Sequence, residues 1–123
     1  MNLQYFNWPD EFACNCGCGV NTFDPSFAQV LDRIRESAGV PMVINSACRC
    51  EKHNEAVGGS PTSSHLIGKQ PVTAVDVKAE DSQSRFKILK AALDHGVRRI
   101  GVYSWGLHID DDQSKPQGVA WVG

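Results

Sequence analysis

The chain has 123 residues, of which 41% are hydrophobic and 21% charged, and its formal net charge is −2 at pH 7. This length predicts one domain over residues 1–123, and the composition is too apolar for a disordered chain. The small negative charge gives no general attraction to nucleic acid or anionic lipid. No stretch approaches the roughly 18 consecutive apolar residues of a membrane-spanning helix, so we expect neither a nucleic-acid nor a membrane partner.

The first half of the chain predicts a helix followed by a strand. Asp24 is a suitable N-cap, Pro25 suits the first helical position, and apolar residues then recur at three- and four-residue steps as far as the helix-ending Gly39. Residues 42–46 form a short run rich in strand-forming side chains. Residues 48–73 are expected to form a loop, with a stretch rich in glycine and serine at its centre.

The second half of the chain predicts one more helix and the rest of a sheet. The alternation at 72–77 favours a half-buried strand, and residues 84–95 favour a helix that buries Phe86, Leu89, Ala92 and Leu93 and ends at Gly96. Further strands are expected at 99–103, 107–110 and 119–122. Together these elements predict a small α+β domain, with a central, mainly antiparallel sheet and two main helices.

The five cysteines fall into two groups, a C-x-C-x-C run (Cys14, Cys16, Cys18) and a C-x-C pair (Cys48, Cys50). The first residues lack the basic and apolar regions of a secretory signal, so we expect cytoplasmic synthesis, where persistent disulfides are disfavoured. One-residue spacing in an extended segment strains chelation, because structural zinc sites space their cysteines two to four apart. Small half-buried thiols, with or without one bridge between the groups, are favoured over a cysteine-zinc site.

Two of the predicted strands carry ionisable side chains between apolar neighbours. The alternation at 107–110 places His108 and Asp110 on one face of their strand. Asp76 lies between two valines, and a buried carboxylate needs a cation or several hydrogen-bond donors. With His65 from the preceding loop, Asp76 and His108 make two histidines and one carboxylate with an open fourth position, the pattern of a catalytic zinc site.

Each of these residues also has a structural interpretation. A single histidine on a strand, such as His108, is more often a hydrogen-bonded residue than a ligand. Asp76 is equally suited to cap a turn or to pair with Arg49. His95 lies at the end of a predicted helix, where a cation suits the dipole, and His53 lies in a polar stretch and is expected to be solvated. Spacing alone leaves both interpretations open.

Beyond these single residues, five motif blocks occur in the order of a known pattern. The chain resembles the zinc D-alanyl-D-alanine carboxypeptidase and L-alanyl-D-glutamate endolysin family, whose fold is shared with the hedgehog signalling domain. The similarity spans about residues 40–112, and the predicted first helix and the segment 11–14 also resemble small phage-type members. The blocks are SACR at 46–49 with Asn54, GG at 58–59, SSHLIG at 63–68, AVDV at 74–77 and GLHID at 106–110.

This resemblance implies a metal site and an activity. It implies that His65, Asp76 and His108 bind one Zn²⁺ per chain. The activity implied is hydrolysis of an amide bond in bacterial peptidoglycan stem peptides, as a D,D-carboxypeptidase or an L-alanyl-D-glutamate endopeptidase. A phage-encoded enzyme of this kind would reach the cell wall after release or as part of a virion.

The resemblance also implies roles for three further residues. Arg49 receives a carboxylate of the substrate peptide, for which its planar fork of donors is well shaped. Ser63 supports the loop of the first ligand and belongs to the substrate-binding set. Asp110 lies near the metal, where it either orients a ligand or handles a proton, and it is our candidate for the catalytic base.

Two departures from the family pattern stand out. His65 and Asp76 are eleven positions apart, longer than the pattern by about four residues, and the extra residues fall between Gly68 and Ala74. A loop insertion is thermodynamically cheap, so we expect a longer hairpin. The second departure is Trp105, which stands where many members carry a catalytic Glu.

Two other classes of protein fit the sequence. One is a non-catalytic, zinc-stabilised module on the same fold, which binds the cell wall or forms part of a phage particle. The other is a small metal or redox protein built on the cysteine cluster. The enzyme should lose its zinc when His65 and His108 are removed. The cysteine-cluster protein should instead lose it when the cysteines are removed.

Overall fold

A five-stranded sheet forms the centre of the computed structural model, which describes residues 1–19, 21–67 and 71–123. The strand order is β1-β2-β4-β3-β5. The pairs β1–β2, β2–β4 and β3–β4 are antiparallel, and β5 pairs with β3 in parallel. The strands are β1 (Val43–Ser46), β2 (Ala74–Lys78), β3 (Arg99–Tyr103), β4 (Gly106–Asp110) and β5 (Val119–Val122).

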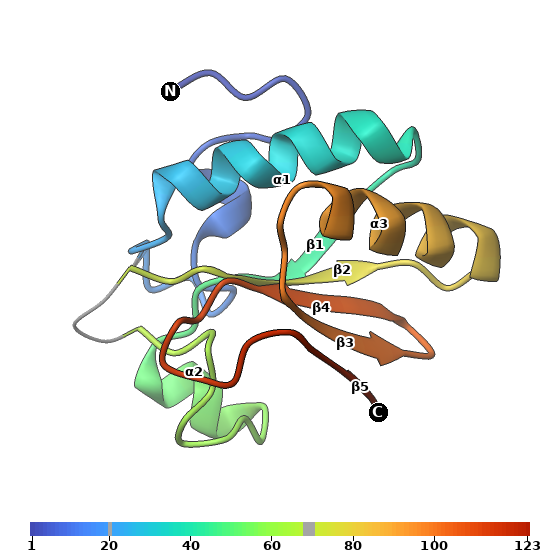
Figure 1. The fold of residues 1–123 in the computed structure, drawn as a ribbon. Helices are drawn as coiled ribbons and strands as arrows, with labels where there is room; N and C mark the ends of the chain where they lie inside the picture. Colours follow the sequence, from blue (N-terminus) through green and yellow to red (C-terminus); the bar gives the residue numbers. More distant parts are fainter. Residues whose placement is uncertain (20, 68–70) are drawn as a thin grey trace.

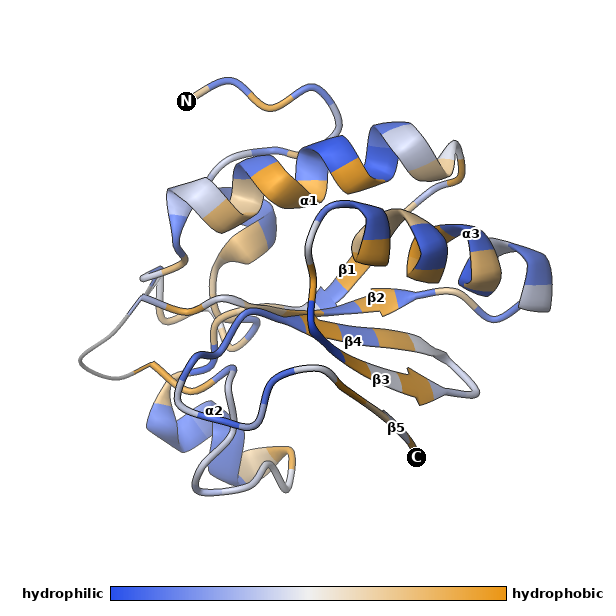
Figure 2. Cartoon of the chain, viewed as in Figure 1, coloured by the Kyte–Doolittle hydropathy of each residue, from blue (hydrophilic) through white to orange (hydrophobic). Residues whose placement is uncertain are grey.

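The two long helices cover one face of this sheet (Figure 1). The helices α1 (Pro25–Ala38) and α3 (Ser82–Asp94) lie together on that face, and the short α2 (Glu51–Ala56) lies on the opposite side (Figure 1). A 3-10 turn, η1 (Asp10–Phe12), precedes α1. Apolar colour on α1 and α3 is concentrated toward the sheet (Figure 2). The fold is therefore the predicted α+β class, with a mainly antiparallel sheet.

The first helix follows the sequence prediction. The Asp24 side chain accepts a hydrogen bond from the Ser26 backbone N–H, and Pro25 occupies the first helical position. Gly39 ends the helix in the left-handed conformation, with φ of 68°. These local signals need no tertiary information, which explains why the sequence alone located both ends.

The apolar face predicted for the second main helix is wrong in part. Phe86 is 63% exposed and Leu93 is 57% exposed, whereas Ile88 and Ala91 are buried. Two overlapping stripes of apolar residues run along this helix, and periodicity alone does not tell which stripe is buried. Ala92, which belongs to the predicted stripe, is buried as expected.

Three further differences concern the connecting segments. The helix α2 forms inside the predicted loop, and the parallel pairing of β5 is an exception to the mainly antiparallel sheet that was expected. The predicted longer hairpin between Gly68 and Ala74 includes residues 68–70, which lie outside the described residues. No helix of the described chain is both long and apolar enough to cross a membrane.

The helix-covered face should dominate stability. Leu31 on α1 is fully buried, and we expect Leu31→Ala to lower the free energy of unfolding by about 3 kcal/mol, through lost transfer energy and a residual cavity. Chemical denaturation would measure it. The exposed Gln29→Ala on the same helix should change stability by less than about 0.5 kcal/mol. Equal effects of the two changes would contradict this packing.

Candidate metal centre

The sheet face without α1 and α3 carries a cluster of ionisable side chains. Asp76 on β2 and His108 on β4 are directly opposite each other in the antiparallel register. The neighbouring apolar residues of β4, Leu107 and Ile109, are fully buried, as the predicted alternation requires. Because β2 and β4 are interior strands of the sheet, both polar side chains start from well-supported backbone.

His65 reaches this cluster from the segment before β2. Its backbone is fixed through Arg49, whose N–H donates to the His65 carbonyl at 2.8 Å, and through an isolated bridge between Arg49 and Leu66. The Ser63 hydroxyl also accepts from the His65 backbone N–H at 3.2 Å. This contact matches the loop-supporting role expected of Ser63. The His65 side chain is only 4% exposed.

Three side-chain atoms from these elements converge on one point. Asp76 Oδ1 lies 3.2 Å from His65 Nε2 and 2.9 Å from His108 Nδ1, and the two nitrogens are 3.2 Å apart. The sequence predicted that these three residues would be neighbours, and the structure brings them together.

The outer nitrogens of both imidazoles face acceptors. His65 Nδ1 lies 2.7 Å from the Ala47 carbonyl oxygen, which can only accept, so Nδ1 carries a proton. His108 Nε2 lies 2.6 Å from Asp110 Oδ2 and donates to that carboxylate. In the neutral imidazoles the inner nitrogens then hold lone pairs, both aimed at Asp76 Oδ1. Three converging acceptors need a positive charge between them, supplied by a proton or a metal ion.

The spacing of the three atoms fits a zinc ion. Tetrahedral coordination with bonds of 2.0–2.1 Å separates two ligand atoms by about 3.3 Å. The observed separations are 2.9 to 3.2 Å. Two neutral imidazoles and a carboxylate also form the donor set of known catalytic zinc sites, and such histidines usually donate their second N–H to a carbonyl or carboxylate. His65 and His108 both do so here.

Electrostatics around the cluster favour a positive charge. Burial alone would raise the pKa of Asp76, but hydrogen bonds and charge from His108 and His65 outweigh it and hold that pKa well below its usual range. Burial likewise opposes protonation of His108, yet hydrogen bonds to Asp110 and Asp76 raise its pKa above the ordinary value. A proton on His108 Nδ1 therefore occupies the place that a metal ion would take.

This competition predicts a pH dependence of metal binding. A raised pKa in the folded state means that His108 holds its proton to higher pH, so zinc affinity should rise as the pH rises through that pKa. We expect the apparent affinity of this site to fall at least tenfold from about pH 8 to about pH 6. Competition with a chelating dye at each pH would measure it. A constant affinity over this range would contradict the assignment of His108 as a ligand.

The folding stability of the metal-free chain changes with pH in the opposite direction to zinc affinity. Because the folded pKa of His108 is raised, its contribution to stability is complete below the unfolded pKa and is lost as the pH rises through the folded pKa. Metal-free and metal-loaded protein should therefore respond to pH in opposite directions at this site.

Asp110 is a buried anchor for His108. Its carboxylate is fully buried and accepts from His108 Nε2 through Oδ2, and from Arg99 Nε at 2.7 Å and the Asp112 backbone N–H at 3.0 Å through Oδ1. Burial would raise the pKa of Asp110, but these donors lower it. Of the two roles that the sequence left open for Asp110, this geometry favours orienting the ligand.

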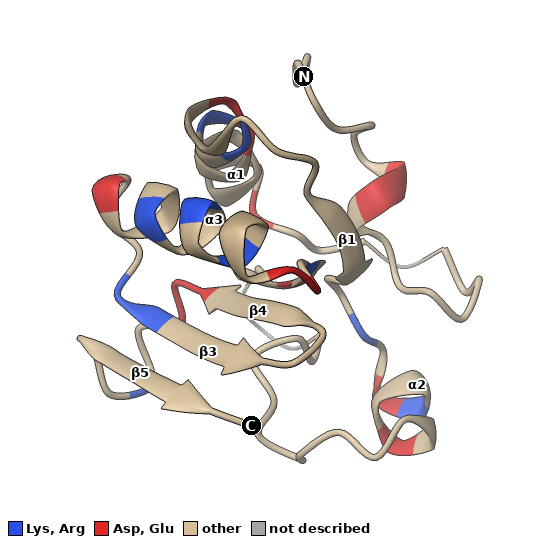
Figure 3. Cartoon of the chain, turned by 90° about the vertical axis from the view of Figure 1, so that its right-hand side faces the viewer, with Lys and Arg blue, Asp and Glu red and all other residues tan. Residues whose placement is uncertain are grey.

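Arg49 lies beside the cluster, on the short segment between β1 and α2. In Figure 3 this segment carries a stretch in the colour of Lys and Arg. Its guanidinium donates to Ser46 Oγ at 3.1 Å, to Asn54 Oδ1 at 3.3 Å and to Asp76 Oδ2 at 3.3 Å. The sequence had left open whether Asp76 pairs with Arg49, and the structure shows this pairing. Since a guanidinium has five N–H donors, two remain for another partner. Arg49 therefore both restrains Asp76 and can receive an external carboxylate.

The other two histidines lie away from the cluster. His95 follows α3, and its Nε2 lies 2.8 Å from Ser37 Oγ at the end of α1, in keeping with the structural role expected of it. His53 is half-buried on α2 rather than fully solvated.

A cleft of about 360 Å³ opens over the three ligand candidates, with one aromatic wall. Tyr103 and Trp105 stack with ring centroids 4.8 Å apart, and the Trp121 indole N–H donates to the Tyr103 hydroxyl at 2.8 Å. Trp121 also lies 5.5 Å from the His108 ring, between centroids. Gly101, opposite His108 in the hairpin, leaves the space that Trp121 fills.

Neither this aromatic wall nor Arg99 was predicted from the sequence as part of the site. A usable signal was present, since the two-residue turn at 104–105 fixes the β3–β4 register. That register pairs Arg99 with Asp110 and Gly101 with His108. Trp121 has no such signal, because its position depends on the parallel return of β5.

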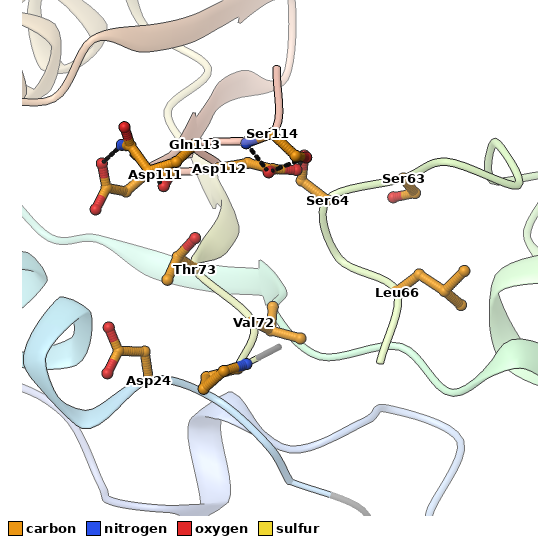
Figure 4. A pocket seen from close by; sticks show the side chains of 11 residues that line it. Asp24, Ser63, Ser64, Leu66, Val72, Thr73, Asp111, Asp112, Gln113 and Ser114 are labelled. Carbon is orange, nitrogen blue, oxygen red and sulfur yellow. Dashed lines mark hydrogen bonds between the residues drawn. The ribbon is translucent and has the colours of Figure 1, made fainter. Parts of the chain in front are cut away.

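A second cavity, of about 690 Å³, adjoins the other side of the His65 loop. Ser63 and Ser64 line both spaces, and the second one is otherwise bordered by acidic and polar side chains together with the apolar Leu66, Pro71 and Val72 (Figure 4). Ser64 Oγ donates to Asp112 Oδ2 at 2.7 Å and accepts from Lys115 Nζ at 2.9 Å. These contacts fasten the His65 loop to the segment after β4.

The fold and this site define a class, a small α+β protein with a two-histidine, one-carboxylate centre in an open cleft. A sequence model of the family described as Peptidase M15 matches residues 4–110. The chain therefore belongs to the Peptidase M15 family, which confirms the resemblance found in its motifs. Membership supports a metallopeptidase that acts on a peptide substrate. No curated protein matches the chain.

Proposed function

We propose that this protein is a zinc-dependent peptidase that hydrolyses an amide bond in the stem peptides of bacterial peptidoglycan. His65, Asp76 and His108 would hold the ion through Nε2, Oδ1 and Nδ1. The observation that carries this proposal is the convergence of three lone pairs on one point in an open cleft. Membership of the Peptidase M15 family supports the same reaction class.

The residues of the chain would divide the work as follows. Zinc in such a site supplies Lewis acidity toward an amide carbonyl and toward water. Asp110 keeps the proton on His108 Nε2, so that Nδ1 stays available as a ligand. Arg49 binds a carboxylate of the peptide with its two remaining N–H donors, which orients the scissile bond. The aromatic wall of Tyr103 and Trp105 gives an apolar surface for small side chains.

The chemistry and openness of the cleft support this substrate class. A bacterial stem peptide offers free carboxylates for Arg49 and alanine methyl groups for the aromatic wall. The cleft is open rather than enclosed, so it admits a peptide that is still attached to the wall polymer. Both cleavage of a terminal D-alanine and cleavage of the L-alanyl-D-glutamate bond satisfy these contacts.

The proposal is tested by incubating zinc-loaded protein with purified peptidoglycan. We expect new amino groups to appear, and mass spectrometry of the released fragments identifies the bond. Free alanine marks a carboxypeptidase, whereas stem peptides with a new D-glutamate N-terminus mark an endopeptidase. No release from several wall types, by protein that holds zinc at the His–Asp site, would contradict a peptidase function.

Arg49 offers a sharper test of substrate orientation. Arg49→Lys keeps the charge but loses the planar fork, so kcat/KM should fall about 10- to 100-fold. The exposed Arg33→Lys on α1 is a matched control and should leave kcat/KM unchanged. Steady-state assays on a soluble stem peptide would measure both. Equal kcat/KM for Arg49→Lys and the wild type would contradict the role of Arg49.

One observation favours a second candidate, a non-catalytic wall-binding or phage structural module. Among the described residues that line the cleft, the only carboxylates are Asp76 and Asp110, and both are already hydrogen-bonded. Trp105 occupies the place of the family's Glu. Zinc-dependent binding to peptidoglycan without release of amino groups would establish this second candidate.

A further inference from the structure

A second group of potential metal ligands lies outside the cleft. Cys14, Cys16 and Cys18 follow η1, and Cys50 is the N-cap residue of α2. The four sulfur atoms all lie within 4.8 Å of one another. Cys14 Sγ is 3.4 Å from Cys16 Sγ and 3.8 Å from Cys50 Sγ. The Sγ atoms of Cys16 and Cys50 are 3.6 Å apart.

These separations fit one ion with four sulfur ligands. Tetrahedral coordination with Zn–S bonds of about 2.3 Å separates two sulfurs by about 3.8 Å. A disulfide needs about 2.05 Å, and all five cysteines are free among the described residues. The cluster therefore has the spacing of a tetrathiolate site rather than of a bridge.

The backbone explains how closely spaced cysteines converge. One-residue spacing strains chelation only where the segment is extended, and here the chain turns instead. The Gly17 N–H donates to the Cys14 carbonyl at 3.4 Å, and Gly17 has φ of 83°. This left-handed residue, which favours glycine, lies between Cys16 and Cys18. The turn directs the side chains on either side of it toward Cys50.

Backbone N–H groups also point at the sulfurs. The Cys50 N–H donates to Cys14 Sγ at 3.4 Å, and the His53 N–H donates to Cys50 Sγ at 3.4 Å. Donors to sulfur stabilise thiolates, the form that binds metal.

Hydrophobic packing does not account for the cluster. Cys16 and Cys18 are exposed and Cys50 is half-buried, so these side chains add little to the core. The fifth cysteine, Cys48, shows the contrast. It is 1% exposed, packs in the core and is not one of the four clustered residues.

We propose that Cys14, Cys16, Cys18 and Cys50 bind one structural Zn²⁺, separate from the ion of the cleft. Four protein ligands leave no open position, which is the arrangement of structural zinc sites. Zinc is assigned over a redox metal because the four cysteines join two chain segments, the one after η1 and the start of α2, which is a structural role. The assignment does not rest on the proposed peptidase activity, and it raises the expected content from one zinc ion per chain to about two.

The position of this site gives it a defined effect. Cys50 directly follows Arg49, whose backbone carbonyl accepts from the Ile67 N–H at 2.8 Å and whose N–H donates to His65. A zinc ion on Cys50 and the N-terminal cysteines would fix both neighbours of the cleft, the Arg49 segment and the His65 loop. Its binding energy would add to folding, because the unfolded chain lacks the preformed site.

Metal analysis and cobalt substitution of the full chain test this proposal. Reduced wild-type protein should bind about two zinc ions, and Co²⁺ should give an intense thiolate-to-cobalt charge-transfer band. The double variant Cys16→Ser/Cys18→Ser should lose one ion and this band. Cys48→Ala should keep both, and His65→Ala/His108→Ala should keep the band while losing the other ion.

Alkylation of the wild-type thiols is a second measurement that does not depend on the folding of a variant. Zinc should slow alkylation of the exposed Cys16 and Cys18 at least about tenfold, as coordination removes the free thiolate. Absence of the charge-transfer band, disulfides within the cluster of zinc-loaded protein, or iron in place of zinc would overturn the proposal. Loss of activity in the His65→Ala/His108→Ala protein alone would leave it intact.

Discussion

His108→Ala is expected to abolish zinc binding at the cleft and to lower peptide hydrolysis at least about 1000-fold. The change removes one of three converging donors and leaves Asp76 Oδ1 facing only His65. It also leaves the buried Asp110 without its histidine partner. Metal analysis together with the rate of amino-group release from peptidoglycan would measure both losses.

His53→Ala is the matched control for this experiment. His53 lies on α2, outside the residues that line the cleft, and its replacement should leave hydrolysis at the wild-type rate. Unfolding would be recognised by circular dichroism. Hydrolysis that persists in folded His108→Ala protein at more than about a tenth of the wild-type rate would show that the reaction does not use this site.

Asp110→Asn should have the next largest effect, through the tautomer of His108. Asp110 Oδ1 accepts from Arg99 Nε and the Asp112 N–H, so the amide oxygen of asparagine must take that place. Its NH₂ group then faces His108 Nε2, which must become the acceptor. The proton moves to His108 Nδ1, where it blocks the metal position. Zinc affinity and kcat/KM should both fall about 10- to 100-fold.

This explanation can be separated from simple destabilisation. The ¹⁵N chemical shifts of His108 report which ring nitrogen is protonated. In metal-free protein at a pH above the raised pKa of His108, where the ring is neutral, the two shifts should exchange between the wild type and Asp110→Asn. The exposed Asp111→Asn is the control and should alter neither the shifts nor the zinc affinity. If Asp110→Asn leaves the Nε2 proton in place, the orienting role of Asp110 is wrong.

The parts of the fold governed by local signals were predictable from the sequence. Asp24, Pro25 and Gly39 locate α1 because capping and left-handed termination are properties of a few residues. The alternation at 107–110 correctly separated the core-facing Leu107 from the cleft-facing His108, since a strand has period two. These predictions needed no knowledge of what packs against the element.

The parts that depend on tertiary packing were not predictable in this way. The buried face of α3 is decided by contact with α1 and the sheet, so Ile88 is buried and Phe86 is exposed. The pairing of β5 with β3 is a long-range return of the chain, and Trp121 enters the cleft only because of it.

The candidate site shows the same division. Asp76 and His108 were identified as unusual by their apolar neighbours on regular strands. His65 lies in an irregular segment with no periodicity, so only its residue type and the family pattern marked it as a candidate ligand. The anchoring of Asp110 by Arg99 depends on hairpin register, and the convergence of Cys16 and Cys18 on Cys50 depends on a turn at Gly17 that spacing alone did not predict.

The most direct test of this account is a crystal structure of the zinc-loaded protein with anomalous data collected at the zinc edge. We expect a peak at about 2.0–2.1 Å from His65 Nε2, Asp76 Oδ1 and His108 Nδ1, with a fourth position open to the cleft. Coordination of His108 through Nδ1 rather than Nε2 is a specific feature of the prediction. Zinc-saturated crystals with no peak between these three atoms would contradict it.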